Sequence, residues 1–145
     1  MPTTLPIQDL RRSNQSLAYL LLRLTLALNM GMHGLTRILA GPAQFAATLP
    51  PEFQKTFLPS AAVYAFGLAT PFIELVLGLA LFLGLATRYA LIAGILWIMI
   101  LTFGTTLRQD WSASGLQLTY ALLYAILLAF LDRNRYALDS MWSTE

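Results

Sequence analysis

Side chains that exchange protons or donate hydrogen bonds interrupt long apolar stretches of this sequence. The candidates are Arg23, Asn29, His33, Glu74, Gln117, Tyr120 and Tyr124. A charged group at the centre of a bilayer costs about 2.5–3.5 kcal/mol on insertion scales, so it needs a partner or a function. Arg23 and Glu74 are candidates for a proton relay. All seven are candidates for hydrogen bonding to a ligand held between helices.

Several other kinds of site are excluded by what the chain lacks. The 145 residues include no Cys and one His, which rules out disulfides, thiolate catalysis and Cys-ligated metals. A zinc site built from several His of one monomer is ruled out too, and we expect no metal. A b-type haem would need a Met or the His of a second copy as its other ligand, so we do not expect haem.

The overall composition indicates a lipid environment. Hydrophobic residues make up 57% of the chain and charged residues 11%, against about 25% charged in an average soluble domain. The mean hydropathy is +0.64. A soluble protein of this size has too much surface to hide so many apolar side chains. Nine Lys and Arg residues are too scattered to follow phosphates, so we expect no nucleic-acid partner.

Four apolar stretches are candidates for helices that cross a bilayer, which takes about 20 mostly apolar residues. The predicted spans are residues 17–39, 61–83, 89–107 and 116–131. Short links make the last three antiparallel neighbours, and a longer loop with several Phe residues, between the first two, is predicted to lie at the membrane interface. The predicted fold is all-α: one membrane domain over residues 1–145, built as a four-transmembrane-helix bundle.

The basic residues near the span ends predict the orientation. Five Arg residues lie on the side of the two termini, and three basic residues, Arg37, Lys55 and Arg108, lie on the other side. Because cytoplasmic loops carry an excess of Lys and Arg, both termini are predicted to be cytoplasmic.

The helical repeat predicts how the polar groups meet. At about 100° per residue, Arg23, Asn29, His33 and Arg37 fall within an arc of roughly 120°, which should face the bundle. The rise of about 1.5 Å per residue then predicts two polar layers. In the central layer, which includes Asn29 and Tyr124, Arg23 reaches Glu74. The outer layer contains His33, Gln117 and Tyr120. The ion pair either serves the function or only fixes the packing, and both interpretations stay open.

Three segments in order resemble a known family. The segments 22–27 (LRLTLA) and 32–37 (MHGLTR), then 74–88 with Glu74 and a Leu-Gly-Leu-Ala-Thr-Arg turn, and finally Arg135–Asp139 (RYALD), are similar to motifs of DoxX-type membrane proteins. The resemblance implies a four-helix bundle in the bacterial inner membrane. It also implies a link to quinone or redox-stress roles, because the family includes the quinone-linked subunit of thiosulfate:quinone oxidoreductase.

The leading hypothesis is a redox-associated membrane protein that binds a quinone or a similar apolar ligand in a polar pocket. Since the chain has no cysteine and no nucleotide-binding loop, a partner protein would have to supply electrons, and the chain is not expected to be catalytic alone. The alternatives are a non-catalytic anchor or assembly subunit and a small transporter, in which the buried Arg–Glu layer is structural. A homodimer is a further arrangement that the sequence allows.

Overall fold

The computed structural model describes residues 7–142, in which every regular element is a helix. The elements are α1 (Ile7–Ala40), α2 (Pro42–Glu52), α3 (Ser60–Leu83), α4 (Thr87–Leu107), α5 (Trp111–Ala129), a single 3₁₀ turn (Leu131–Arg133) and α6 (Asp139–Trp142). The predicted all-α fold is confirmed.

Three of the helices, α3, α4 and α5, are long and apolar enough to cross a membrane. The first predicted span, residues 17–39, lies within α1, which is not one of these three; Arg23, Asn29, His33 and Arg37 interrupt its apolar residues. The membrane character of the chain is therefore clear, while the count of four crossings stays a prediction.

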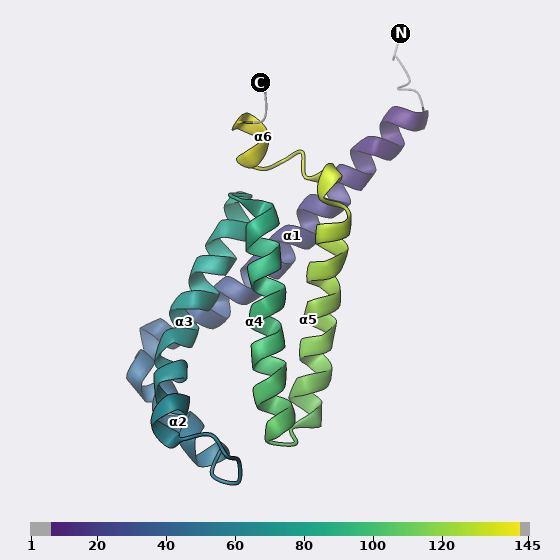
Figure 1. The fold of residues 1–145 in the computed structure, drawn as a ribbon. Helices are drawn as coiled ribbons and strands as arrows, with labels where there is room; N and C mark the ends of the chain where they lie inside the picture. Colours follow the sequence, from purple (N-terminus) through teal and green to yellow (C-terminus); the bar gives the residue numbers. More distant parts are fainter. Residues whose placement is uncertain (1–6, 143–145) are drawn as a thin grey trace.

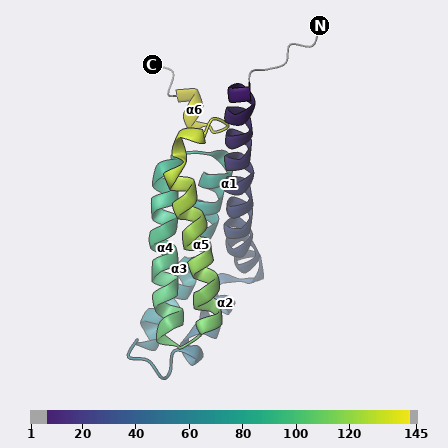
Figure 2. The same ribbon diagram turned by 90° about the vertical axis from the view of Figure 1, so that its right-hand side faces the viewer.

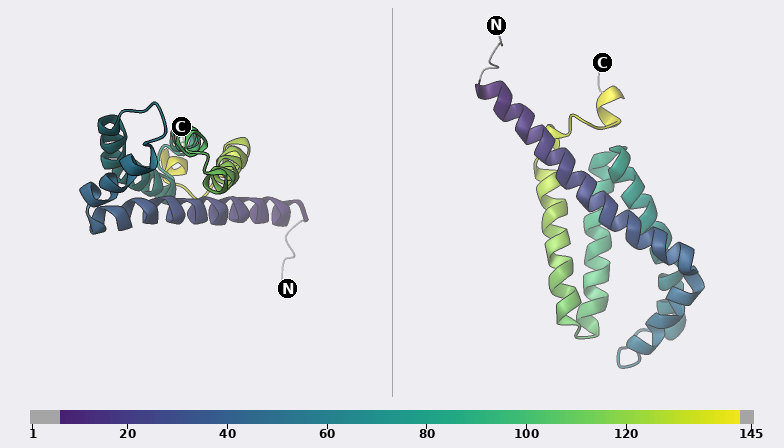
Figure 3. Two further views of the ribbon diagram at one scale, coloured as in Figure 1. Left: turned by 90° about the horizontal axis from the view of Figure 1, so that it is seen from below. Right: turned by 180° about the vertical axis from the view of Figure 1, so that it is seen from behind.

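Helix α1 lies obliquely across a bundle that the other long helices form. Helices α4 and α5 run side by side, α3 lies next to them, and α1 crosses the back of the bundle (Figures 1 and 2). Seen from below, α1 lies along one side of the molecule, with the other helices on its other side (Figure 3). The start of α1 and the short α6 lie at the same end.

Helix α2 occupies much of the segment that was predicted to be a loop. Pro42 begins it, as suits a first turn whose N–H groups have no partner in the helix. The helix packs closely on α3 at Gly67, where a Cβ atom would lie 2.9 Å from the Cα of Ala46 and from a methyl group of Leu49. The prediction of a loop at 42–52 was wrong because this segment has an apolar face that α3 buries.

Close contact between backbones sets how α1 and α3 are aligned. A Cβ atom on Gly78 would overlap the backbone of Gly31, and one on Gly34 would overlap the backbone of Pro71 and Leu75. The antiparallel pair therefore places Gly31 against Gly78 and Gly34 against Leu75. Small residues at such crossings allow the van der Waals packing that drives helix association in membranes.

The segment after α5 closes the end of the bundle where α1 begins. Arg23, which is 2% exposed, donates from Nη2 to the carbonyl of Tyr136 at 2.6 Å. Asp139 accepts from the backbone N–H groups of Ala86 at 2.6 Å and Thr87 at 2.7 Å, and so caps α4. Burial raises the pKa of Asp139, but the hydrogen bonds from Thr87 and Ala86 outweigh it and hold the pKa below its ordinary value. The capping carboxylate is thus ionised at neutral pH, and its stabilisation is lost only in acid below the usual Asp range.

The contact of Gly34 with α3 predicts a position-specific cost of adding one methyl group. Gly34→Ala is expected to destabilise the protein by about 1–3 kcal/mol, because the helices have to separate to accept the Cβ atom. The matched control is Gly115→Ala on α5, where nothing lies within 4 Å of the added atom; helix propensity makes it neutral or stabilising by up to about 1 kcal/mol. Thermal unfolding in detergent measures both. Equal melting temperatures for the two variants would contradict the alignment.

Candidate functional site

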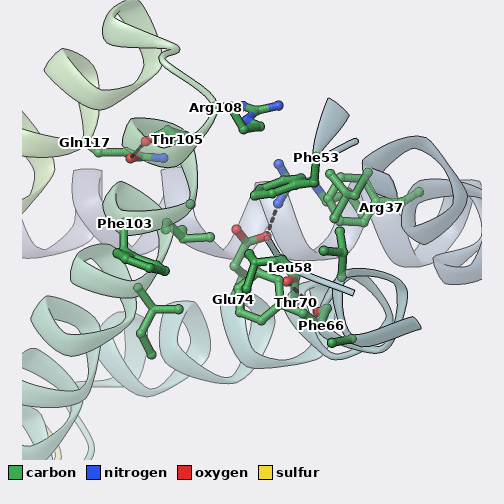
Figure 4. Close-up of a pocket in the computed structure, with 17 residues that line it drawn as sticks. Arg37, Phe53, Leu58, Phe66, Thr70, Glu74, Phe103, Thr105, Arg108 and Gln117 are labelled. Carbon is green, nitrogen blue, oxygen red and sulfur yellow. Dashed lines mark hydrogen bonds and ion pairs between the residues drawn. The ribbon is translucent and has the colours of Figure 1, made fainter. Parts of the chain in front are cut away.

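A cavity of about 400 Å³ lies among the last turn of α1, α2, the part of α3 from its first turn to Glu74, and the ends of α4 and α5 that meet at their connecting turn. Four aromatic side chains give it apolar walls: Phe45, Phe53, Phe66 and Phe103. Its size and lining fall in the range of sites for small apolar molecules, which run from about 300 to 1,000 Å³. Figure 4 shows these walls with the polar side chains that reach between them.

The first polar feature of the cavity is an ion pair between α1 and α3. Arg37 donates from Nη1 to Oε2 of Glu74. The Glu74 side chain is 5% exposed and that of Arg37 is 28% exposed, so the carboxylate is the buried partner. The Arg37 guanidinium also lies 4.4 Å from the centre of the Phe45 ring, which adds a cation–π contact with α2. Arg37 therefore binds both helices that flank it.

The second polar feature joins α4 to α5. Thr105 donates its hydroxyl to Oε1 of Gln117 at 2.8 Å and lies 2.9 Å from the hydroxyl of Ser114. Within the described residues, the amide nitrogen of Gln117 has no hydrogen-bond partner. Gln117 lines the cavity. Its two N–H groups are therefore free to donate to an acceptor on a ligand.

Arg108 ties the end of α2 to the turn between α4 and α5. It forms ion pairs with Glu52 and with Asp110, the latter at 3.1 Å, and its guanidinium lies 5.4 Å from the centre of the Phe53 ring. Arg37 and Arg108 thus act alike, since each forms an ion pair, Arg37 with one acidic residue and Arg108 with two, and each contacts one Phe of the segment 45–53. Together they hold α2 and the following residues over the cavity.

Two of the predicted site residues, Glu74 and Gln117, line the cavity. The prediction that Arg23 reaches Glu74 was wrong: Arg23 binds Tyr136, and Arg37 takes the place opposite Glu74. The reason is the alignment of α1 with α3. With Gly34 against Leu75, Glu74 lies one turn of α1 beyond His33, about 21 Å along α1 from Arg23.

The remaining predicted residues lie elsewhere. Asn29 and His33 are exposed on the outer face of α1, so the expectation that they face the bundle was wrong. Tyr124 is fully buried, with its ring against Gly94, and Tyr120 is half-buried at the edge of the same core. Neither tyrosine lines the cavity. The buried side of α1 is centred on Arg23, and Asn29 points about 120° away from it, so the predicted polar arc was wider than the buried face.

Arg37 and Arg108 are the site residues that were not predicted. Both were assigned to the same side of the membrane by the distribution of basic residues, and Arg37 belongs to the polar arc of α1. Two Arg residues on one side, near a Phe-rich connection between spans, were the available signal. Counting them only as indicators of orientation missed their cation–π contacts.

These observations define a class: a helical membrane protein with a buried ion pair at the edge of an apolar cavity. The family follows from comparison with known proteins. The DoxX family model matches residues 18–107, which is more than half of the chain, and the chain belongs to the DoxX family. Arg37, Glu74 and most of the cavity fall within the matched region, whereas Gln117 and the Asp139 cap lie beyond it. No curated protein and no solved structure matches the chain.

The buried carboxylate predicts an asymmetric response to loss of its partner. Arg37→Met is expected to cost about 3 kcal/mol, the low end for a buried pair because Arg37 is partly exposed. Glu74→Gln should cost less, and the double variant should regain stability relative to Arg37→Met, because no unpaired carboxylate stays buried. Thermal unfolding in detergent at neutral pH measures the series. Lys55→Met, which removes an exposed cation, is the control; a melting temperature for Arg37→Met equal to that of this control would refute the pairing.

Proposed function

We propose that this DoxX-family membrane protein binds a quinone or a similar apolar ring in the cavity among α1–α5. The observation that carries the proposal is the combination of aromatic walls with two separate polar points, the Arg37–Glu74 pair and the Thr105–Gln117 pair (Figure 4). A quinone ring presents flat apolar faces and two carbonyl acceptors on opposite edges. Aromatic walls suit the faces, and separate donors suit the carbonyls.

Two groups are proposed to recognise the ligand's oxygen atoms. The free amide N–H groups of Gln117 donate to one carbonyl. The guanidinium of Arg37 donates to the other while it keeps its bond to Glu74. Glu74 is proposed to pass protons, because a carboxylate beside a quinone oxygen is suited to general acid–base work. Arg23 has no part in this relay, since it is committed to Tyr136.

Electrons are proposed to come from a partner oxidoreductase. The sequence has neither cysteine nor a nucleotide-binding loop, so a redox role needs a second protein or cofactor to supply them. The alternative, a non-catalytic anchor or assembly subunit, predicts that the Arg37–Glu74 pair stabilises the bundle and that the cavity has no affinity for quinones.

We also propose the bacterial inner membrane as the location, with both termini in the cytoplasm. The start of α1 and α6 lie at one end of the bundle, which is the end with the larger number of Arg residues (Figure 1). The positive-inside tendency then assigns that end to the cytoplasm. The cavity lies at the opposite end, in the outer half of the membrane.

Trp97 offers a direct readout of binding. Its ring stacks on Phe66, a cavity residue, with ring centres 5.2 Å apart. In the Trp111→Phe/Trp142→Phe background, Trp97 is the one remaining tryptophan, and decylubiquinone is expected to quench its fluorescence in a saturable way. Gln117→Leu should weaken binding roughly fivefold to tenfold through loss of one hydrogen bond. Gly104→Leu, whose Cβ points toward Phe53 at 3.4 Å, should fill the cavity and abolish saturation.

Two matched controls accompany these variants. Gly115→Leu adds the same side chain where no atom lies within 4 Å, and His33→Ala removes a polar group outside the cavity. Both should bind decylubiquinone as the background does. Quenching that never saturates, or equal loss in His33→Ala and Gln117→Leu, would reject the quinone site and favour the anchor alternative.

A further inference from the structure

The outer face of α1 carries a regular pattern of exposed residues that do not pack against the other helices. Exposed residues alternate at spacings of three and four: Leu21, Thr25, Leu28, Met32, Leu35 and Leu39. Asn29, His33 and Thr36 lie beside them on the same exposed surface. Figure 3 (right) shows α1 running uncovered across the molecule. A repeat of about 3.5 residues on a helix is the spacing with which two helices pack against each other.

Two side chains on this face, those of Asn29 and His33, make no hydrogen bond with the described residues. Thr25 and Thr36 satisfy their hydroxyls on carbonyls of their own helix, at 2.8 and 2.7 Å. Along α1, Asn29 is two residues before Gly31 and His33 is next to Gly34, and these two glycines contact the middle of the apolar helix α3. In the predicted membrane span over residues 17–39, acyl chains offer no hydrogen bonds, so exposure of these groups to lipid would be costly.

We propose that this face binds a second copy of the chain, α1 against α1, about a two-fold axis near Asn29. A primary amide both donates and accepts, so Asn29 can pair with Asn29 of the partner subunit across such an axis. Residues 24–36 contain no Asp, Glu, Lys or Arg, so two identical faces meet without charge repulsion. The shallow hollow of about 470 Å³ over Thr25, Asn29, Met32 and His33 receives side chains of the second copy. Polar pairing of this kind stabilises helix association in membranes.

Because the chain contains no cysteine, disulfide linkage through a single introduced cysteine reports on that position alone. Met32→Cys puts one thiol at the centre of the face, and Met99→Cys puts one at a comparably exposed position on α4. Oxidation in native membranes is expected to link Met32→Cys into a disulfide dimer of twice the chain mass and to leave Met99→Cys monomeric. Equal linkage of the two variants, no linkage of Met32→Cys, or its linkage to a protein of another mass would overturn the proposal.

A second variant tests the role of the amide itself. In the Met32→Cys background, Asn29→Ala is expected to lower the yield of linked dimer several-fold at low protein-to-lipid ratio, since the amide pair is lost. Thr119→Ala, an exposed polar position on α5, should leave the yield unchanged. An unchanged yield in Asn29→Ala would show that Asn29 does not hold the interface. Saturable quenching of Trp97 by decylubiquinone does not depend on this contact. The quenching experiment therefore tests the quinone site, and the cysteine linkage tests the dimer, independently of each other.

Discussion

The backbone contact between α1 and α3 is the constraint on which the rest of the structure depends. Glycines let the two helices approach until Gly31 meets Gly78 and Gly34 meets Leu75. Because the two helices are antiparallel, residues later in α1 lie beside residues earlier in α3. Arg37 then arrives beside Glu74, and Arg23 arrives beside the turn at Gly84, where it binds the carbonyl of Tyr136.

The buried carboxylate has an unfavourable position that the surrounding helices make tolerable. Removing Glu74 from water costs free energy that a single ion pair does not reliably recover, so its presence is weak evidence for stability alone. The surroundings of Glu74 indicate a further role. The Arg37–Glu74 pair lies on the wall of an aromatic cavity, and a second Arg–Phe contact, Arg108 with Phe53, holds α2 and the following residues over that cavity. A group that is costly to bury and faces an open space is well placed to act on a ligand.

The sequence was sufficient for the broad architecture and insufficient for the pairing inside it. Apolar length and short links located α3 and α4 to within two residues, since lipid imposes these lengths, whereas α5 begins five residues before the predicted start at residue 116. Depths counted from the ends of apolar stretches gave Arg23 as the partner of Glu74, because α1 extends well beyond its apolar part and its alignment is set by glycine contacts. Gln117 was found because a polar group inside an apolar helix stands out. Arg37 and Arg108 lie near helix ends, where Arg is ordinary, and only the contacts with α2 reveal them.

The alignment of α1 with α3 can be measured directly, because the chain contains no cysteine. Two double-cysteine variants, Arg37→Cys/Glu74→Cys and Arg23→Cys/Glu74→Cys, are treated in membranes with a short bismaleimide and analysed by mass spectrometry for a bridge within one chain. We expect a bridge between positions 37 and 74 and none between 23 and 74. A bridge between 23 and 74 in place of the other would contradict the alignment, and with it the position of the cavity.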